Sequence, residues 1–69
     1  MRDVVKRAFA RKLRAYLTVR GESYRGFADR TGMSHHTINA LANEKAVPNA
    51  RSAWTCSQAL NCRVSDLVS

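Results

Sequence analysis

The sequence has little that would indicate strands, membrane segments or several domains. No stretch alternates apolar and polar residues over many positions, so β-strands are not favoured. No apolar run approaches the roughly 20 residues that a membrane-crossing helix needs, and none follows the basic N-terminus as in a secretory signal. A length of 69 residues allows one small domain, which we expect to span residues 1–69.

Cysteine and histidine are too few, and wrongly spaced, for a metal site. Cys56 and Cys62 form no C-x-x-C pair, and His35 and His36 are adjacent. We therefore expect reduced thiols in a cytoplasmic protein, with neither a metal ion nor another cofactor. We also expect no enzyme activity, because neither histidine has a carboxylate or a thiol at a catalytic spacing.

Acidic residues are scarce, and this scarcity gives the first positive indication. Twelve Lys or Arg against five Asp or Glu leave a net charge of +7. The excess lies mainly in residues 1–25, which hold eight cations and two acids. A small basic domain usually binds a polyanion, with nucleic acid as the first candidate and an anionic membrane as the second.

Helical periodicity and capping residues predict an all-α chain. We expect five helices, over residues 3–19, 24–31, 35–42, 50–60 and 64–68. On the first, an apolar stripe opposes an arginine ridge formed by Arg7, Arg11 and Arg14. The expected N-caps are Ser23, Ser34 and Asn49, and the expected left-handed ends are Gly21, Gly32 and Asn61.

The inward faces follow from the same periodicity. The first helix should bury Val5, Phe9, Leu13 and Leu17, with Ala8 and Tyr16 near them. The second should bury Phe27, Ala28 and Thr31, and the third Ile38 and Leu41. The fourth should bury Ala50, Ala53, Trp54, Ser57 and Leu60, and the fifth Val64, Leu67 and Val68.

Residues 24–43, YRGFADRTGMSHHTINALAN, carry the most informative pattern. A helix-turn-helix needs a small residue where its helices cross, and Ala28 is in that place. It needs a left-handed residue in the turn, which suits Gly32. Three further positions must be apolar, and they hold Phe27, Ile38 and Leu41.

This pattern resembles the Cro and lambda-repressor family of helix-turn-helix proteins, also called the Xre type. The stretch SYRGFADRTGMSHHTINALANEK is similar to that family's second and third helices, without a gap. The stretch VPNARSAWTCSQALNCRVSDLV resembles its fourth and fifth helices, so the likeness covers residues 9–68. The resemblance implies a five-helix, lambda-repressor-like DNA-binding domain.

The resemblance further implies that the third helix, about residues 35–42, enters the major groove and reads bases. The helical wheel agrees independently, because burying Ile38 and Leu41 points His36, Asn39 and Asn43 outward. A histidine N–H can donate to guanine, and a carboxamide can pair with adenine. The candidate base contacts are His35, His36, Thr37, Asn39 and Ala40.

Phosphate contacts would fix the position of the protein on DNA. The candidates are Ser23, Tyr24 and Arg25 at the start of the second helix, and Ser34, Asn43, Lys45 and Arg51. Tyr24 departs from the family, which usually has glutamine there. Leu17 and Ala42 also depart, since some relatives pair an arginine with a glutamate at these positions. The start of the first helix, with Arg2, Lys6 and Arg7, would be a basic arm along the DNA or a longer core helix.

The predicted function is a sequence-specific, double-stranded DNA-binding transcriptional regulator, a repressor of the Cro or phage-immunity type. It would act in the cytoplasm, either associated with the nucleoid or encoded by a phage in its host cell, and bind no small-molecule ligand. Two binding modes are open: a homodimer through the ends of the fourth and fifth helices, including Leu67 and Val68, or a monomer on an asymmetric site. The alternatives are a restriction-system controller, a protein-binding module that reuses the fold, and a membrane-active peptide built on the first helix.

Overall fold

The computed structural model describes residues 2–69 and contains the five expected helices. They are α1 (Arg2–Arg20), α2 (Tyr24–Thr31), α3 (His35–Ala42), α4 (Ala50–Leu60) and α5 (Val64–Val68). The described residues form no strand, and none of their helices is long and apolar enough to cross a membrane. The all-α prediction is therefore confirmed, with helix ends that differ from the expected ones by one residue at most.

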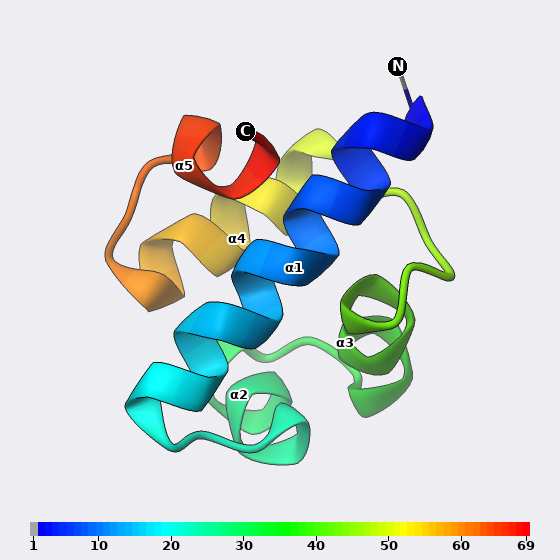
Figure 1. The fold of residues 1–69 in the computed structure, drawn as a ribbon. Coiled ribbons are helices and arrows are strands. Elements are labelled where there is room, and N and C mark those ends of the chain that lie inside the picture. Colours follow the sequence, from blue (N-terminus) through cyan, green and yellow to red (C-terminus); the bar gives the residue numbers. More distant parts are fainter. Residues whose placement is uncertain (1) are drawn as a thin grey trace.

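The helices enclose a single core beneath α1. Figure 1 shows α1 crossing the front of the molecule diagonally, with α2 below it, α3 to its right and α4 behind it. Helix α1 packs on α3 and α5, while α2 packs on α3 and α4. The Cα radius of gyration is 10.5 Å. Helix α3 thus lies at one side of the molecule, supported by α1 and α2.

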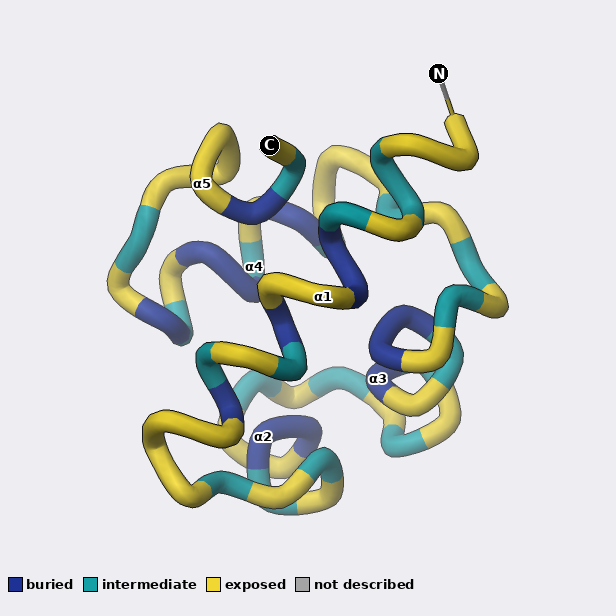
Figure 2. Tube along the Cα trace, viewed as in Figure 1, coloured by how far each residue is buried: buried dark blue, intermediate teal, exposed yellow. Residues whose placement is uncertain are grey.

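The core contains most of the residues that the apolar stripes predicted. Phe9, Leu13 and Leu17 of α1 are buried and meet the buried inner faces of the other helices, as Figure 2 shows by the dark segments turned inward. Val5 is only half-buried at the end of this stripe. The other buried members of the cluster are Phe27, Ala28, Ile38, Leu41, Ala42, Ala53, Cys56, Leu60 and Leu67.

The predicted capping residues determine where the helices begin. The Oγ of Ser23 accepts a hydrogen bond from the Gly26 N–H at 3.0 Å, and Asn49 Oδ1 accepts from the Ser52 N–H at 2.7 Å. Each bond satisfies an N–H group that has no partner inside its helix. Asn61 ends α4 in the left-handed conformation, as expected.

Thr31, an unusual polar residue at a position expected to be inward, stabilises the turn after α2. Its hydroxyl donates to the Ala28 carbonyl at 3.2 Å and accepts from the Met33 N–H at 3.3 Å. Gly32 follows in the left-handed conformation, with φ of +76°. The half-buried hydroxyl both donates and accepts a hydrogen bond. These two bonds, and not apolar packing, connect the end of α2 to the turn.

The predicted inward faces of α4 and α5 are partly wrong. Trp54 is 59% exposed, and Ala50 and Val64 are also exposed. Ala53, Ser57 and Leu60 of α4 are buried as predicted, and Cys56 is buried in addition. A helical period allows either Trp54 or Cys56 beside these three residues, and the smaller Cys56 lets α4 approach its neighbours closely. Leu67 is fully buried, as its inward position on α5 predicted, so it belongs to the core and is not free for the dimer surface at which it was also expected.

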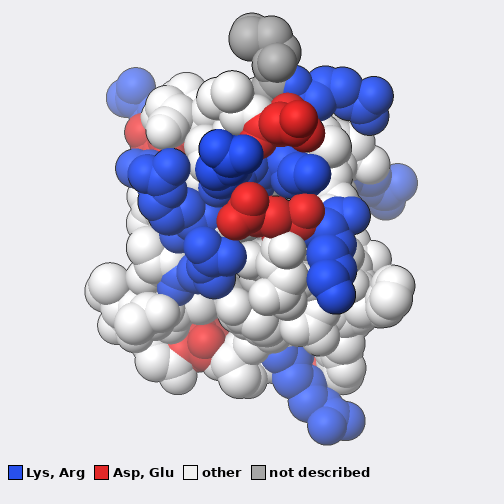
Figure 3. Space-filling view, turned by 45° about the vertical axis from the view of Figure 1, so that its right-hand side comes forward, with Lys and Arg blue, Asp and Glu red and all other residues white. Residues whose placement is uncertain are grey.

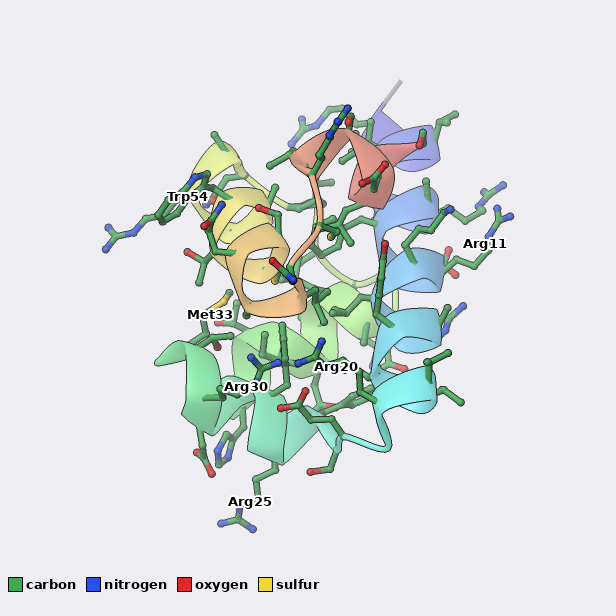
Figure 4. All side chains as sticks on the ribbon, turned by 90° about the vertical axis from the view of Figure 1, so that its left-hand side faces the viewer. Arg11, Arg20, Arg25, Arg30, Met33 and Trp54 are labelled. Carbon is green, nitrogen blue, oxygen red and sulfur yellow. The ribbon has the colours of Figure 1, made fainter. Side chains whose placement is uncertain are left out.

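Arg30 joins three parts of the fold that are distant in sequence. Its guanidinium donates to both carboxylate oxygens of Glu22 at 2.8 and 2.9 Å and to the Ala59 carbonyl of α4 at 2.8 Å. It also lies 5.3 Å from the centre of the Phe27 ring. Figure 4 shows Arg30 near Arg20, which is 3.6 Å from the same Glu22. The connection between α1 and α2 is thereby fastened to α2 and to the end of α4.

The contact with Arg30 makes the stability of the fold sensitive to acid. Hydrogen bonding from Arg30 holds the pKa of Glu22 below its ordinary value, with a smaller contribution from Arg20 and against an opposing effect of burial. A carboxyl group whose pKa is lower in the folded state stabilises the fold at pH values above its unfolded-state pKa. This stabilisation is lost as the pH falls through its folded-state pKa. We expect Glu22→Gln to lower the free energy of unfolding at pH 7 and to reduce the further loss between pH 5 and pH 3. Urea denaturation at each pH measures both effects, and parallel profiles for the two proteins would contradict this.

The left-handed turn residue gives a second prediction about stability. A Cβ added at Gly32 would meet no atom within 4 Å, so a substitution there is opposed by the backbone conformation alone. We expect Gly32→Val to destabilise the fold by about 1–2 kcal/mol or more, because a β-branched residue is strongly disfavoured at this φ. Gly32→Asn should lose less, since asparagine tolerates the left-handed region. Equal losses for the two variants in thermal denaturation would exclude this cause.

Candidate nucleic-acid interface

The rotation of α3 about its axis is fixed by its buried side. Ile38, Leu41 and Ala42 are buried against the core. At 100° per residue this leaves the side chains between them on the outer side. His36, Asn39 and Asn43 are exposed and Ala40 is half-buried. With Lys45, these four residues line an open hollow of about 370 Å³.

Two of the predicted contact residues are used to begin α3. The Oγ of Ser34 accepts a hydrogen bond from the Thr37 N–H at 3.0 Å and lies 2.8 Å from the Thr37 hydroxyl. This is the geometry of an N-cap. Ser34, predicted to contact phosphate, and Thr37, predicted to contact a base, thus also have a structural role at the start of α3. The sequence predicted this structural role only for Ser34.

His35 is held by a residue that the sequence did not single out. Its Nε2 lies 2.8 Å from Oδ1 of Asp29 on α2. The two side chains come from opposite sides of the turn around Gly32 and remain 43% and 68% exposed. His35 and His36 therefore differ, because only His35 has a carboxylate partner among the described residues. A six-residue separation across a turn gives no periodic signal that could have predicted this pair.

The beginning of α2 brings together the first group of phosphate candidates. Ser23 caps the helix, Tyr24 is half-buried against the core and Arg25 is exposed. Figure 4 shows Arg25 extending away from the body of the molecule. An open hollow of about 560 Å³ lies beside them and is also lined by Arg14. The packing of Tyr24 explains how this site accepts an aromatic residue where glutamine was expected.

The second group of phosphate candidates follows α3 in the sequence. The Nδ2 of Asn43 donates to the Asn39 carbonyl at 2.8 Å, so this amide closes the end of α3. The next residue, Glu44, is left-handed with φ of +61°, and the Lys45 N–H then reaches the Ala40 carbonyl at 2.8 Å. The side chain of Lys45 is exposed, and so is Arg51 at the start of α4.

The arginine ridge of α1 borders the end of α3. Arg14 donates from Nη1 to the Ala42 carbonyl at 2.8 Å, and Arg7 Nε lies 3.7 Å from Oε1 of Glu44. Arg11 between them is exposed. The ridge is therefore continuous with the loop that carries Lys45. In Figure 3, Lys and Arg side chains gather on the upper part of this face around acidic side chains.

Leu17 and Ala42 cannot form the arginine–glutamate pair that some Cro-like proteins have at these positions. A different polar contact joins α1 to α3. Both residues are buried, so the expected apolar packing is confirmed. The bond from Arg14 to the Ala42 carbonyl nevertheless brings an arginine of α1 to the end of α3. Its charge stays partly in water and meets the negative end of the helix dipole, which avoids the cost of a buried charge.

The predicted basic arm is part of a helix in the structure. Residues 2–7 form the first turns of α1, where Lys6 lies 3.7 Å from Asp3 and Arg7 is paired with Glu44. Arg2 is exposed. This segment therefore lengthens α1.

The two cysteines lie away from this interface. Burial raises the pKa of the Cys56 thiol to about 11, with the nearby Cys62 adding to the shift. A hydrogen bond with Cys62 is the main cause of the raised pKa of Tyr16. A buried thiol with such a pKa remains protonated at neutral pH and is a poor nucleophile. No group of three or more metal-ligating side chains occurs in the part of the chain that is described.

The hydrogen bond from Arg14 to the Ala42 carbonyl should stabilise the fold beyond any effect of the net charge of the arginine ridge. We expect Arg14→Met to destabilise the fold by about 1 kcal/mol, because the Ala42 carbonyl loses its charged donor. Arg11→Met removes the same charge from the same ridge at an exposed position, so its effect should be close to zero. Urea denaturation of the two variants measures the difference, and equal midpoints would show that the Arg14 bond contributes nothing.

Comparison with known proteins gives no match. No protein-family model matches the sequence, and neither a curated protein nor a solved structure gives a match. The function of the protein must therefore be inferred from its own residues and their arrangement.

Proposed function

We propose that the protein is a sequence-specific, double-stranded DNA-binding transcriptional regulator, a repressor of the Cro or phage-immunity type. The observation that carries the proposal is the outer side of α3. Burial of Ile38 and Leu41 presents His36, Asn39 and Asn43 to solvent as a row of hydrogen-bonding side chains. An exposed helix with such a row has the width and the chemistry to read bases in the major groove.

We infer that α2 and α3 act as a helix-turn-helix. Ala28 is fully buried where a small residue is required, and Gly32 is left-handed in the turn. The exposed basic side chains of Arg25, Lys45 and Arg51 lie at segments that flank α3 in the sequence. Phosphate contacts from such residues would supply most of the affinity and fix the register of α3 on the duplex.

The dimer expected from the family could not use Leu67, one of the two residues predicted for its surface. Leu67 is committed to the core, whereas Val64 is 36% exposed and Val68 is half-buried. These two valines offer a small apolar contact at α5. Binding as a monomer to an asymmetric site therefore remains the second mode within this proposal.

A second candidate is a protein-binding module that reuses the fold, and the exposure of Trp54 favours it. Tryptophan is enriched at the centres of protein interfaces, and Trp54 projects from α4 at the edge of the molecule (Figure 4). This candidate predicts weak, sequence-indifferent DNA binding, so the same experiment separates the two functions.

Selection from a random pool of duplexes tests the proposal. We expect enrichment of one sequence, with a palindrome indicating a dimer. Asn39→Ala should cost about 1–3 kcal/mol on that sequence and change the preferred base at one position. Lys45→Ala should weaken binding to all sequences and lower the slope of log affinity against log salt by about one.

Lys12→Ala is the matched control for the charge. Lys12 lies with Ala15, Tyr16 and Val19 on another part of α1, so its loss should leave the salt slope nearly unchanged. Equal affinity for the selected duplex and for random duplexes would refute sequence-specific regulation.

A further inference from the structure

The contact between α2 and α3 through Asp29 and His35 involves the first residue of the helix proposed to read DNA. The distance of 2.8 Å between Asp29 Oδ1 and His35 Nε2 is that of a hydrogen bond to a charged acceptor. His35 is 43% exposed in its side chain, so its ring is accessible. Its other ring nitrogen, Nδ1, makes no hydrogen bond within residues 2–69.

The chemistry of the two groups decides where the proton of the ring lies. An ionised carboxylate only accepts hydrogen bonds, and a neutral imidazole carries a single N–H. The contact therefore places that proton on Nε2 and leaves a lone pair on Nδ1. Asp29 is bonded to the first residue of α3, where the helix dipole favours a negative charge. The carboxylate therefore occupies the single N–H of the neutral ring.

We propose that Asp29 sets the base preference of His35. With its N–H taken by the carboxylate, the ring meets DNA through Nδ1 as an acceptor. In the major groove the matching donors are the amino groups of cytosine N4 and adenine N6, whereas guanine offers only acceptors. A histidine without this contact can present its N–H to DNA and so donate to guanine. This inference rests on the proposed function and names Asp29 as a positioning residue for it.

The test compares selections from one random duplex pool at pH 8, above the range in which histidine ordinarily titrates. His35→Ala identifies the base pair that His35 reads, as the position whose preference disappears. Asp29→Asn keeps the shape of the side chain, but its amide donates as readily as it accepts. The proton of the ring is then no longer committed to Nε2.

We expect wild type to prefer cytosine or adenine at that position. Asp29→Asn should raise the relative selection of guanine about fivefold, the effect of one hydrogen bond of about 1 kcal/mol. Glu44→Gln is the control, because it removes one acidic charge beside Lys45 while leaving the His35 ring untouched. It should strengthen binding to all sequences without changing any base preference.

Each remaining outcome overturns a defined part of the proposal. An unchanged preference in Asp29→Asn, or a His35→Ala selection identical to wild type, overturns the role of Asp29 and leaves DNA reading by α3 intact. Equal changes in Asp29→Asn and Glu44→Gln would show that charge, and not the tautomer, is responsible. A wild-type pool without enrichment overturns the proposed function and this inference together.

Discussion

The burial of Ile38 and Leu41 is the constraint on which the candidate interface depends. A helix of eight residues is rigid, so fixing two of its side chains in the core fixes the direction of all the others. The positions of His36 and Asn39 follow from this without any contact of their own. The side that packs and the side that could bind DNA are therefore set by a single apolar interaction with α1 and α2.

Two arginines complete the attachment of the short helices. Arg30 donates to the Ala59 carbonyl in the last turn of α4, and Arg14 donates to the Ala42 carbonyl at the end of α3. Each guanidinium meets carbonyl groups that lack a partner within their own helix and lie at the negative end of its dipole. In a chain too short for a large core, such contacts supplement apolar burial. They also leave part of each cation in water, which avoids the cost of burying it.

The arrangement of charges follows from the small number of acids. The five acids of the sequence all have partners: Asp3, Glu22, Asp29 and Glu44 contact basic side chains, and Asp66 accepts from the Arg63 N–H. Arg11, Lys45 and Arg51 have no acidic partner in the described part of the chain. Most of the net charge of +7 is thus left on cations that face solvent, where a polyanion can replace water.

The sequence by itself determined the five helices, their caps and the inner side of α3, because these depend on neighbours within a few residues. Ser23, Ser34, Asn49 and Gly32 act through their own backbone segments. Only the tertiary structure decided that Trp54 faces solvent, that Cys56 is buried and that Asp29 meets His35. A helical period allows more than one buried side, and contacts between helices depend on how they cross. That choice is made by the packing of the whole chain.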